Sequence, residues 1–211
     1  MSVTHSKENI LKKIRKALSH STPLPFSKSE GNQFVFLPLQ LEAEVEFAEQ
    51  FTKLQGRFAY CNNQQELAKQ LSDLIISRQW KNVYCCEETL KQFLHKNGFN
   101  DFSDVELKNC DCSITNCEAL VARTGSIVLS ANQTQGRTTS IYAPVHICVA
   151  FTNQLVYELR DALQMLKDKY KEKLPSLISF ATGPSRTADI EKTLVVGVHG
   201  PKEVFLFLTE A

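Results

Sequence analysis

Apolar residues at helical spacing alternate along the chain with short runs of apolar and β-branched residues. Helical spacing occurs at residues 41–55, 64–78 and 87–98, and the last of these ends on a glycine, a residue that commonly closes a helix. The runs GRFAYC and NVYCC lie between these helices and predict strands. Because a helix that joins two strands lets them run parallel, this half predicts a mainly parallel sheet covered by helices on both faces.

The C-terminal half contains more strand patterns and fewer helical ones. Residues 116–121 predict one short helix, and residues 154–174 predict a long one. Four further strands are expected, with the sequences SIVLS, VHICVAF, LISFAT and EVFLFLT. No internal repeat or further boundary interrupts this part, so residues 36–211 are expected to form one α/β domain.

Residues 1–35 predict an N-terminal arm that consists of a helix and a linker. An apolar stripe at helical spacing runs between lysines and is formed by Ile10, Leu11, Ile14 and Leu18. Turn-forming residues follow it. We expect this amphipathic helix to dock on protein, either on its own domain or on another subunit, and binding to a membrane surface is the less favoured alternative.

The composition is that of an ordinary folded protein. The 211 residues include 43% hydrophobic and 22% charged residues, and 24 basic residues nearly balance 23 acidic ones. This balance argues against a nucleic-acid partner, which usually selects a basic surface. The N-terminal sequence lacks the apolar stretch of an export signal, and the longest apolar run, residues 145–151, is too short to span a bilayer. We therefore expect a cytoplasmic protein with reduced cysteines and no membrane span.

The run ISFATGPSRTADIE combines a strand with a glycine-containing loop. Strands of an open parallel sheet carry ligand sites at their carboxyl ends, so the loop is expected to bind a ligand. Gly183 permits close backbone approach, and Arg186 is a planar fork suited to a carboxylate or phosphate. Ser185 and Thr187 add hydroxyl groups. Asp189 is either a helix cap or orienting partner, or a direct ligand or catalytic contact.

The run VGVHGP places a histidine between two glycines just before the last strand. His199 can act as an acid, a base or a ligand donor near neutral pH, and Gly200 lets the backbone approach a ligand closely. The alternative is a tight turn whose imidazole satisfies a local hydrogen bond. Both runs fall within residues 182–201, the first region where we expect a small anionic ligand or cofactor to bind.

Residues 122–146 form the second such region. Thr124, Gly125 and Ser126 precede a strand and offer the same residue types again. Arg137 lies in a turn, either as an anion contact or as a solvated arginine. His146 stands at the entry to an apolar strand, where a hydrogen-bonded core histidine is favoured over a functional one.

These runs together resemble the LUD domain of the lactate-utilisation protein C family. The resemblance rests on TGPSRTADIE and GVHGP in this order, preceded by TGSIVL, Arg137 and the run PVH, and it covers about residues 40–210. It implies a three-layer α/β/α fold similar to the NagB/RpiA/CoA-transferase-like group. Where many members have an acidic residue before the Thr-Gly pair, this chain has Arg123.

The resemblance also implies a role in the oxidation of L-lactate to pyruvate, together with partner proteins that carry iron–sulfur clusters. Two other functions stay open. One is a stand-alone enzyme of the CoA-transferase or ligase type, acting on a phosphorylated or carboxylated small molecule, and the other is a non-catalytic subunit that binds a metabolite. No residue pair identifies an acid–base or nucleophile–base couple, so no catalytic residue is assigned. A homo-oligomer is also left open.

No cofactor is assigned from sequence motifs. The chain contains no GxGxxG run, no phosphate-binding P-loop and no GxSxG elbow. The spacing of Cys110, Cys112 and Cys117 suggests a metal site, because thiolates bind metal ions. A fourth cysteine at a fitting spacing is missing, so we expect no metal site. The other cysteines fall in expected strands and are interpreted as small buried hydrophobic residues.

Overall fold

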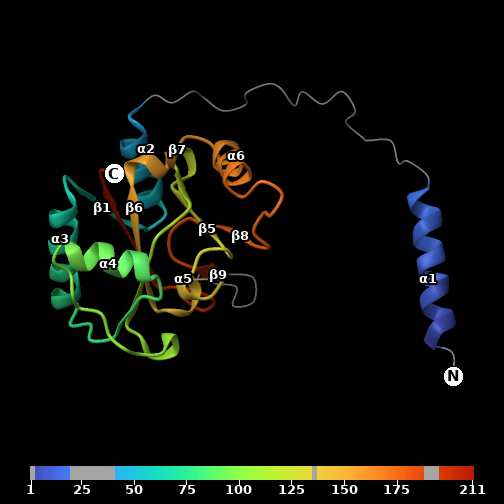
Figure 1. Cartoon of the computed structure of the whole chain (residues 1–211), viewed down its shortest axis with the longest axis horizontal. Helices are drawn as coiled ribbons and strands as arrows, with labels where there is room; N and C mark the ends of the chain where they lie inside the picture. Colours follow the sequence, from blue (N-terminus) through green and yellow to red (C-terminus); the bar gives the residue numbers. More distant parts are fainter. Residues whose placement is uncertain (1–2, 20–40, 135–136, 188–194) are drawn as a thin grey trace. The chain divides into compact units, whose positions relative to one another are not determined.

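The computed structural model describes residues 3–19, 41–134, 137–187 and 195–211. The chain divides by its internal contacts into two compact units, residues 1–38 and 39–211. The first unit holds helix α1 (Val3–Leu18), whose four stripe residues are exposed. The second unit holds the other described helices and strands (Figure 1).

A five-stranded sheet lies at the centre of the second unit. Its strands run in the order β1-β11-β6-β3-β2, and every neighbouring pair is parallel. Their bounds are β1 Arg57–Cys61, β2 Val83–Tyr84, β3 Cys112–Thr115, β6 Val145–Phe151 and β11 Glu203–Thr209. The sequence predicts four of these strands. It does not predict β3, because the four residues of this strand include two polar ones and form no apolar run.

Two helices cover one face of this sheet, α3 (Gln64–Ser77) and α4 (Glu88–Lys96). Their apolar residues pack in one core with the side chains of β3 and β6 that point to this face. Both helices have the ends that the sequence indicates. Asn63 Oδ1 accepts a hydrogen bond from the backbone N–H of Glu66 at 2.8 Å, and Gly98 follows α4 with a φ of 101°.

The other face is covered by α2 (Ala43–Lys53) and by a second sheet. This sheet has the strand order β7-β4-β5-β8, with bounds Leu155–Val156, Ala119–Val121, Ser126–Ser130 and Ile178–Ala181. Helix α6 (Leu159–Tyr170) packs on its outer face through Ala162 and Leu166. Figure 1 shows α3 and α4 on one side of the β1 and β6 layer, and β5, β8 and α6 on the other. A mainly parallel sheet with helices on both sides confirms the expected α/β/α class.

The second sheet corrects two expected helices. Residues 119–121 form β4 rather than a helix, because Leu120 enters one core while Ala119 and Val121 enter another. This two-residue alternation is the period of a strand. The long helix expected over residues 154–174 begins only at Leu159, since β7 pairs with β4 before it.

The strand that precedes the GPSRT run also differs from the expectation. β8 is an edge strand of the second sheet and pairs antiparallel with β5. Its residues are half-buried or exposed, whereas the sequence suggested a buried strand of the parallel sheet. The loop that follows β8 is therefore not at the carboxyl edge of the parallel strands.

A buried carboxylate ties α6 to the second sheet. Glu118 accepts hydrogen bonds from Ser130 Oγ at 2.6 Å, from Tyr170 OH at 2.7 Å and from Lys169 Nζ at 2.7 Å. Because a buried carboxylate is stable only with such partners, this network fixes the last turn of α6. In the described ranges, no helix combines the length and apolarity that a membrane span requires.

Candidate functional site

The two predicted ligand regions meet at the amino ends of β6 and β11. His146 is the second residue of β6, and Pro201 and Lys202 directly precede β11. This is the opposite end of the sheet from the one at which parallel strands usually carry ligands. The expected position of the loop at the carboxyl ends of the parallel strands is therefore wrong, and the reason is that β8 belongs to the second sheet.

Two adjacent cavities open where these segments meet. One has a volume of about 330 Å³ and is lined by residues 179–185, by residues 199–201 and by α5 (Thr139–Tyr142). The other has a volume of about 490 Å³ and lies between α5 and residues 197–202. Ile141, His199 and Gly200 line both, so the cavities are two lobes of one candidate site.

Backbone hydrogen bonds join the TGPSR and GVHGP turns. The N–H of Ser185 donates to the carbonyl of Pro201 at 3.0 Å, and the N–H of Gly197 donates to the carbonyl of Ser185 at 2.9 Å. A Cβ on Gly200 would lie 2.8 Å from the Cβ of Ser185, so the close approach requires glycine there. The two motifs are therefore one structural unit, and Ser185, His199 and Gly200 all line it.

Three hydroxyl groups connect the two regions. Thr124 Oγ1 lies 2.7 Å from Ser126 Oγ, which in turn lies 3.1 Å from Thr182 Oγ1. Thr182 lines the smaller lobe. Each hydroxyl can donate one hydrogen bond and accept others. The other two hydroxyl groups therefore orient the Thr182 hydroxyl at the cavity wall. Thr124 and Ser126 thus reach the site through Thr182 and do not line it themselves.

Other predicted residues hold the loops against the C-terminal end of α2. Gly125 and Gly183 have positive φ values of 59° and 89°. A Cβ on Gly125 would lie 2.4 Å from the backbone nitrogen of Phe51, and one on Gly183 would lie 2.5 Å from the carbonyl oxygen of Leu54. Arg186 Nη2 donates to the same Leu54 carbonyl. Arg186 lines neither of the two cavities, and this hydrogen bond directs its Nη2 toward the end of α2.

The lining of the site combines apolar walls with polar groups and one lysine. Lys202 lines the larger lobe, and the exposed side chain of His199 lines both. The described residues that line the two lobes include no aspartate or glutamate. This charge pattern suits an anionic ligand.

A buried histidine forms part of the wall of the smaller lobe. His146 Nε2 lies 2.8 Å from Thr115 Oγ1, which is the hydrogen-bonded core position that the sequence favours. Burial lowers the pKa of His146 to about 4, so its imidazole is neutral at neutral pH. The ring therefore adds no charge to the wall of the smaller lobe.

The remaining predicted residues lie away from the lobes. Arg137 Nη2 donates to Ser176 Oγ at 2.6 Å on the exposed surface. Thr187 lies in β9 (Arg186–Thr187), which pairs with β10 (Val195–Val196). Arg123 Nε forms an ion pair with Glu158 Oε1 at 2.8 Å. Asp189 lies outside the described residues.

Sequence reasoning missed one wall of the site and the contact that holds the loops against α2. Ile141 and Tyr142 of α5 are exposed apolar side chains, but a helix of four residues gives no periodic signal. The contact with α2 involves backbone atoms, so it does not require particular residue types in α2 that a sequence could reveal. Lys202 could have been found, because it follows the GVHGP run directly.

The cysteines are distributed over separate cores. All seven are free thiols, and Cys112 and Cys117 lie in the cores on opposite faces of the parallel sheet. Cys61, Cys85 and Cys148 are buried as expected, whereas Cys86 is only half-buried. Burial raises the pKa of both Cys85 and Cys112 to about 12. Among the residues that the structure describes, no three His, Cys, Asp or Glu side chains are placed to hold a metal ion.

The fold and its joined motif loops define a three-layer α/β protein with a candidate site between α5 and the two motif turns. The LUD domain profile matches residues 101–209, a segment that includes both motif regions. The chain therefore belongs to the LUD domain family. The resemblance seen in the sequence is confirmed.

Curated relatives carry the name lactate utilization protein C. The protein of that name from Anoxybacillus flavithermus is 35% identical over 104 residues, which is 49% of this chain and 46% of the relative. The one from Geobacillus sp. is 33% identical over 147 residues, 62% of this chain and 61% of the relative. This chain thus spans about half of the length of the curated relatives that it matches.

A solved structure supports the fold. The crystal structure of a DUF162 family protein from Deinococcus radiodurans matches this chain with a TM-score of 0.61 and 19% sequence identity. The match covers 82% of this chain and 99% of that one. At this level of identity the likeness concerns the fold alone.

Proposed function

We propose that this chain is a component of an L-lactate utilisation system and binds a small anionic ligand or cofactor at loops 122–146 and 182–201. One observation carries the proposal: both motif regions converge on one site, whose described lining has Lys202 and His199 and no carboxylate. The lactate assignment draws on the relatives named lactate utilization protein C. Family membership supports carrying that role over to this chain.

The size and chemistry of the smaller lobe favour a small carboxylate. Its volume of about 330 Å³ lies at the lower end of the range for ligand pockets. The hydroxyl groups of Thr182 and Ser185 would supply hydrogen bonds at its wall, and the neutral imidazole of His146 adds no charge there. Lys202 supplies positive charge at the neighbouring lobe, where a carboxylate would be drawn in, and His199 adds a hydrogen-bonding imidazole there.

The oxidation itself requires an electron acceptor. L-Lactate loses two electrons and two protons when it becomes pyruvate. We assign the electrons to iron–sulfur clusters in partner proteins, each of which accepts one electron at a time, because this sequence carries no dinucleotide-binding motif. The chain itself then contributes ligand binding and orientation within the complex.

Ligand binding is tested by calorimetry and thermal shift on the purified full chain. L-Lactate, pyruvate, CoA and a sugar phosphate are compared, with His199→Ala and Ser185→Ala as site variants and Arg137→Ala as the matched surface control. We expect saturable binding of a small carboxylate that both site variants weaken and the control keeps. Binding that survives in both site variants, or no binding of any carboxylate, contradicts the proposed ligand.

The partner assignment is tested by reconstitution. Iron–sulfur proteins co-purified with the chain should reduce a dye with L-lactate as the electron donor, and the rate should fall when the chain is left out. Equal rates with and without the chain would remove it from the reaction. Turnover of a CoA ester by the isolated chain would favour the stand-alone enzyme instead, and ligand binding without turnover in the full mixture would favour a metabolite-binding subunit.

A further inference from the structure

The larger lobe of the candidate site is more spacious than a small carboxylate requires. Its volume of about 490 Å³ lies within the range of pockets that hold drug-sized ligands. It adjoins the smaller lobe, because Ile141, His199 and Gly200 line both. A carboxylate in the smaller lobe therefore leaves room for a second molecule directly beside it.

One wall of the larger lobe is apolar and aromatic. It is formed by α5 and the two residues that follow it, and Tyr142 is 70% exposed on this wall. Ile141 and Val198 also line the lobe with exposed aliphatic side chains. Planar rings pack well against a tyrosine ring and its aliphatic neighbours. This wall suits a ligand with a flat aromatic ring.

The other wall carries a lysine that the GVHGP turn holds in place. The N–H of Lys202 donates to the carbonyl of Pro144 at 2.8 Å. A Cβ on Gly197 would overlap the Cγ of Lys202, so glycine at this position leaves room for the lysine side chain. Lys202 forms no ion pair with another residue that the structure describes. Its charge is therefore available to an anion, and lysine is a common partner of phosphate groups.

Backbone N–H groups of the same turn add further donors. Within the described ranges, the N–H groups of Val198, His199 and Gly200 donate to no backbone carbonyl. They follow Gly197, whose φ is 80°. Successive N–H groups beside a left-handed residue form concave sites for anions. The turn and Lys202 together thus suit a phosphate, which has several acceptor oxygens.

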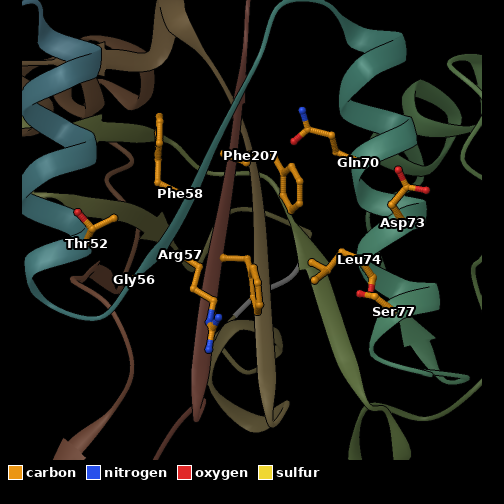
Figure 2. A pocket seen from close by; sticks show the side chains of 11 residues that line it. Thr52, Gly56, Arg57, Phe58, Gln70, Asp73, Leu74, Ser77 and Phe207 are labelled. Atoms are coloured by element: carbon orange, nitrogen blue, oxygen red, sulfur yellow. The ribbon is translucent and has the colours of Figure 1, made fainter.

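A more spacious cavity elsewhere in the chain lacks this combination. It has a volume of about 730 Å³ and lies between α2 and α3, with Arg57, Asp73 and Phe207 in its lining (Figure 2). Arg57 Nε lies 2.8 Å from Glu203 Oε2, so the positive charge is already balanced. Asp73 adds a negative charge to the lining. An anionic ligand is therefore favoured at the larger lobe and not in this groove.

The proposed reaction also requires a cofactor between lactate and the iron–sulfur clusters. L-Lactate loses its two electrons together when a hydride leaves C2, whereas each cluster accepts one electron at a time. Flavins accept a hydride and also take part in one-electron chemistry. A phosphorylated flavin combines this chemistry with a planar ring and a phosphate, the two groups that the walls of the larger lobe suit.

We propose that the larger lobe binds a phosphorylated flavin such as flavin mononucleotide (FMN), with its ring against Tyr142 and its phosphate at Lys202 and the N–H groups of residues 198–200. This inference rests on the proposed function, because lactate oxidation is what selects a flavin among planar phosphates. The C2–H bond of lactate breaks and its hydride passes to the flavin, while the hydroxyl proton is released and the C2=O bond forms. The reduced flavin then gives its two electrons to the clusters one at a time and releases the second proton.

Fluorescence titration of FMN with the purified full chain tests the site in the absence of lactate. Riboflavin, which lacks the phosphate, and AMP, which lacks the flavin ring, are the comparison ligands. We expect saturable binding of FMN that is roughly tenfold tighter than that of either, because each comparison ligand gives up one of the two walls. No binding of FMN at high micromolar protein overturns the proposal, and so does riboflavin or AMP that binds as tightly as FMN.

Two variants assign the walls of the lobe. Lys202→Ala should weaken FMN roughly tenfold and leave riboflavin unchanged, whereas Tyr142→Ala should weaken both flavins. The matched controls are Lys69→Ala on α3 and Tyr60→Ala on β1, which change exposed residues of the same types outside the two lobes. Circular dichroism of each variant verifies that the fold is kept. FMN binding that neither Lys202→Ala nor Tyr142→Ala weakens places the flavin elsewhere and overturns the proposal.

Flavin binding and carboxylate binding can fail separately. A chain that binds a small carboxylate but no FMN contradicts the flavin site and leaves the proposed function standing. A chain that binds FMN through Lys202 and Tyr142 but binds no carboxylate supports the flavin site and contradicts the proposed carboxylate ligand.

Discussion

The motif loops have two sides that differ in what their residues do. On one side, Gly125, Gly183 and Arg186 contact the backbone at the C-terminal end of α2, including its cap residue Leu54. On the other, Ser185 and His199 line the candidate site. Residues of the same motif therefore serve opposite purposes: those against α2 fix the loops, and those at the cavity are available to a ligand. The comparison predicts large stability effects on the α2 side and binding effects without stability effects on the cavity side.

Gly125→Ala should give the largest loss of stability. The new Cβ would lie 2.4 Å from the nitrogen of Phe51, on a residue with a φ of 59°. Overpacking against rigid backbone and a left-handed conformation together should cost roughly 3 to 5 kcal/mol in the free energy of unfolding. The matched control is Gly98→Ala, which has a φ of 101° and open space around its Cβ, and should cost only about 1 kcal/mol. Equal losses in urea unfolding would mean that α2 does not constrain the loop.

His146 should make the fold sensitive to acid. Its pKa is lowered to about 4 by burial, so the unfolded chain takes up a proton below about pH 6.5 that the folded chain refuses until about pH 4. Stability is therefore lost as the pH falls through this window, by roughly 3 kcal/mol for this group. Unfolding curves of His146→Gln should lack this part of the pH dependence. An unchanged slope in the variant would mean that His146 can take up a proton in the folded state.

Arg186→Ala should lower stability by about 2 kcal/mol, the value of a hydrogen bond from a charged donor to a backbone acceptor. The matched control, Arg137→Ala, removes an exposed arginine and should change stability by less than about 0.5 kcal/mol. Arg186→Lys should recover only part of the loss, because a lysine lacks the planar fork. An Arg186→Ala variant that stays stable but no longer binds ligand would mean that Arg186 acts in ligand binding rather than in holding the loops.

The α3 and α4 side of the fold could be predicted from the sequence because each of its helices buries one periodic face in a single core. Leu67, Leu71 and Ile75 lie at helical spacing and all enter that core. The second sheet could not be predicted in this way. Leu120 enters one core and its two neighbours another, and the pairing that makes this a strand comes from β5 and β7, which lie later in the chain.

The residues of the site could be predicted from the sequence, but the directions in which their side chains point could not. The sequence identified Ser185, His199 and Gly200, and the structure brings them together. It also identified Arg186, but the direction of that side chain depends on a carbonyl 132 positions earlier in the chain, at Leu54. Residue type states which chemistry a side chain can perform. Long-range packing decides whether the side chain faces a ligand or the fold.

His199→Ala and Ser185→Ala should have the smallest effects on stability and thereby give the sharpest test of the comparison. His199 is exposed and Ser185 is half-buried, so each variant should unfold within about 0.5 kcal/mol of the unchanged chain. Affinity for a small carboxylate should nevertheless fall at least tenfold, which corresponds to about 1.4 kcal/mol of binding free energy. Titration calorimetry and urea unfolding on the same samples separate the two quantities. If stability falls with affinity in both variants, the cavity side also holds the loops together, and the division between the two sides is lost.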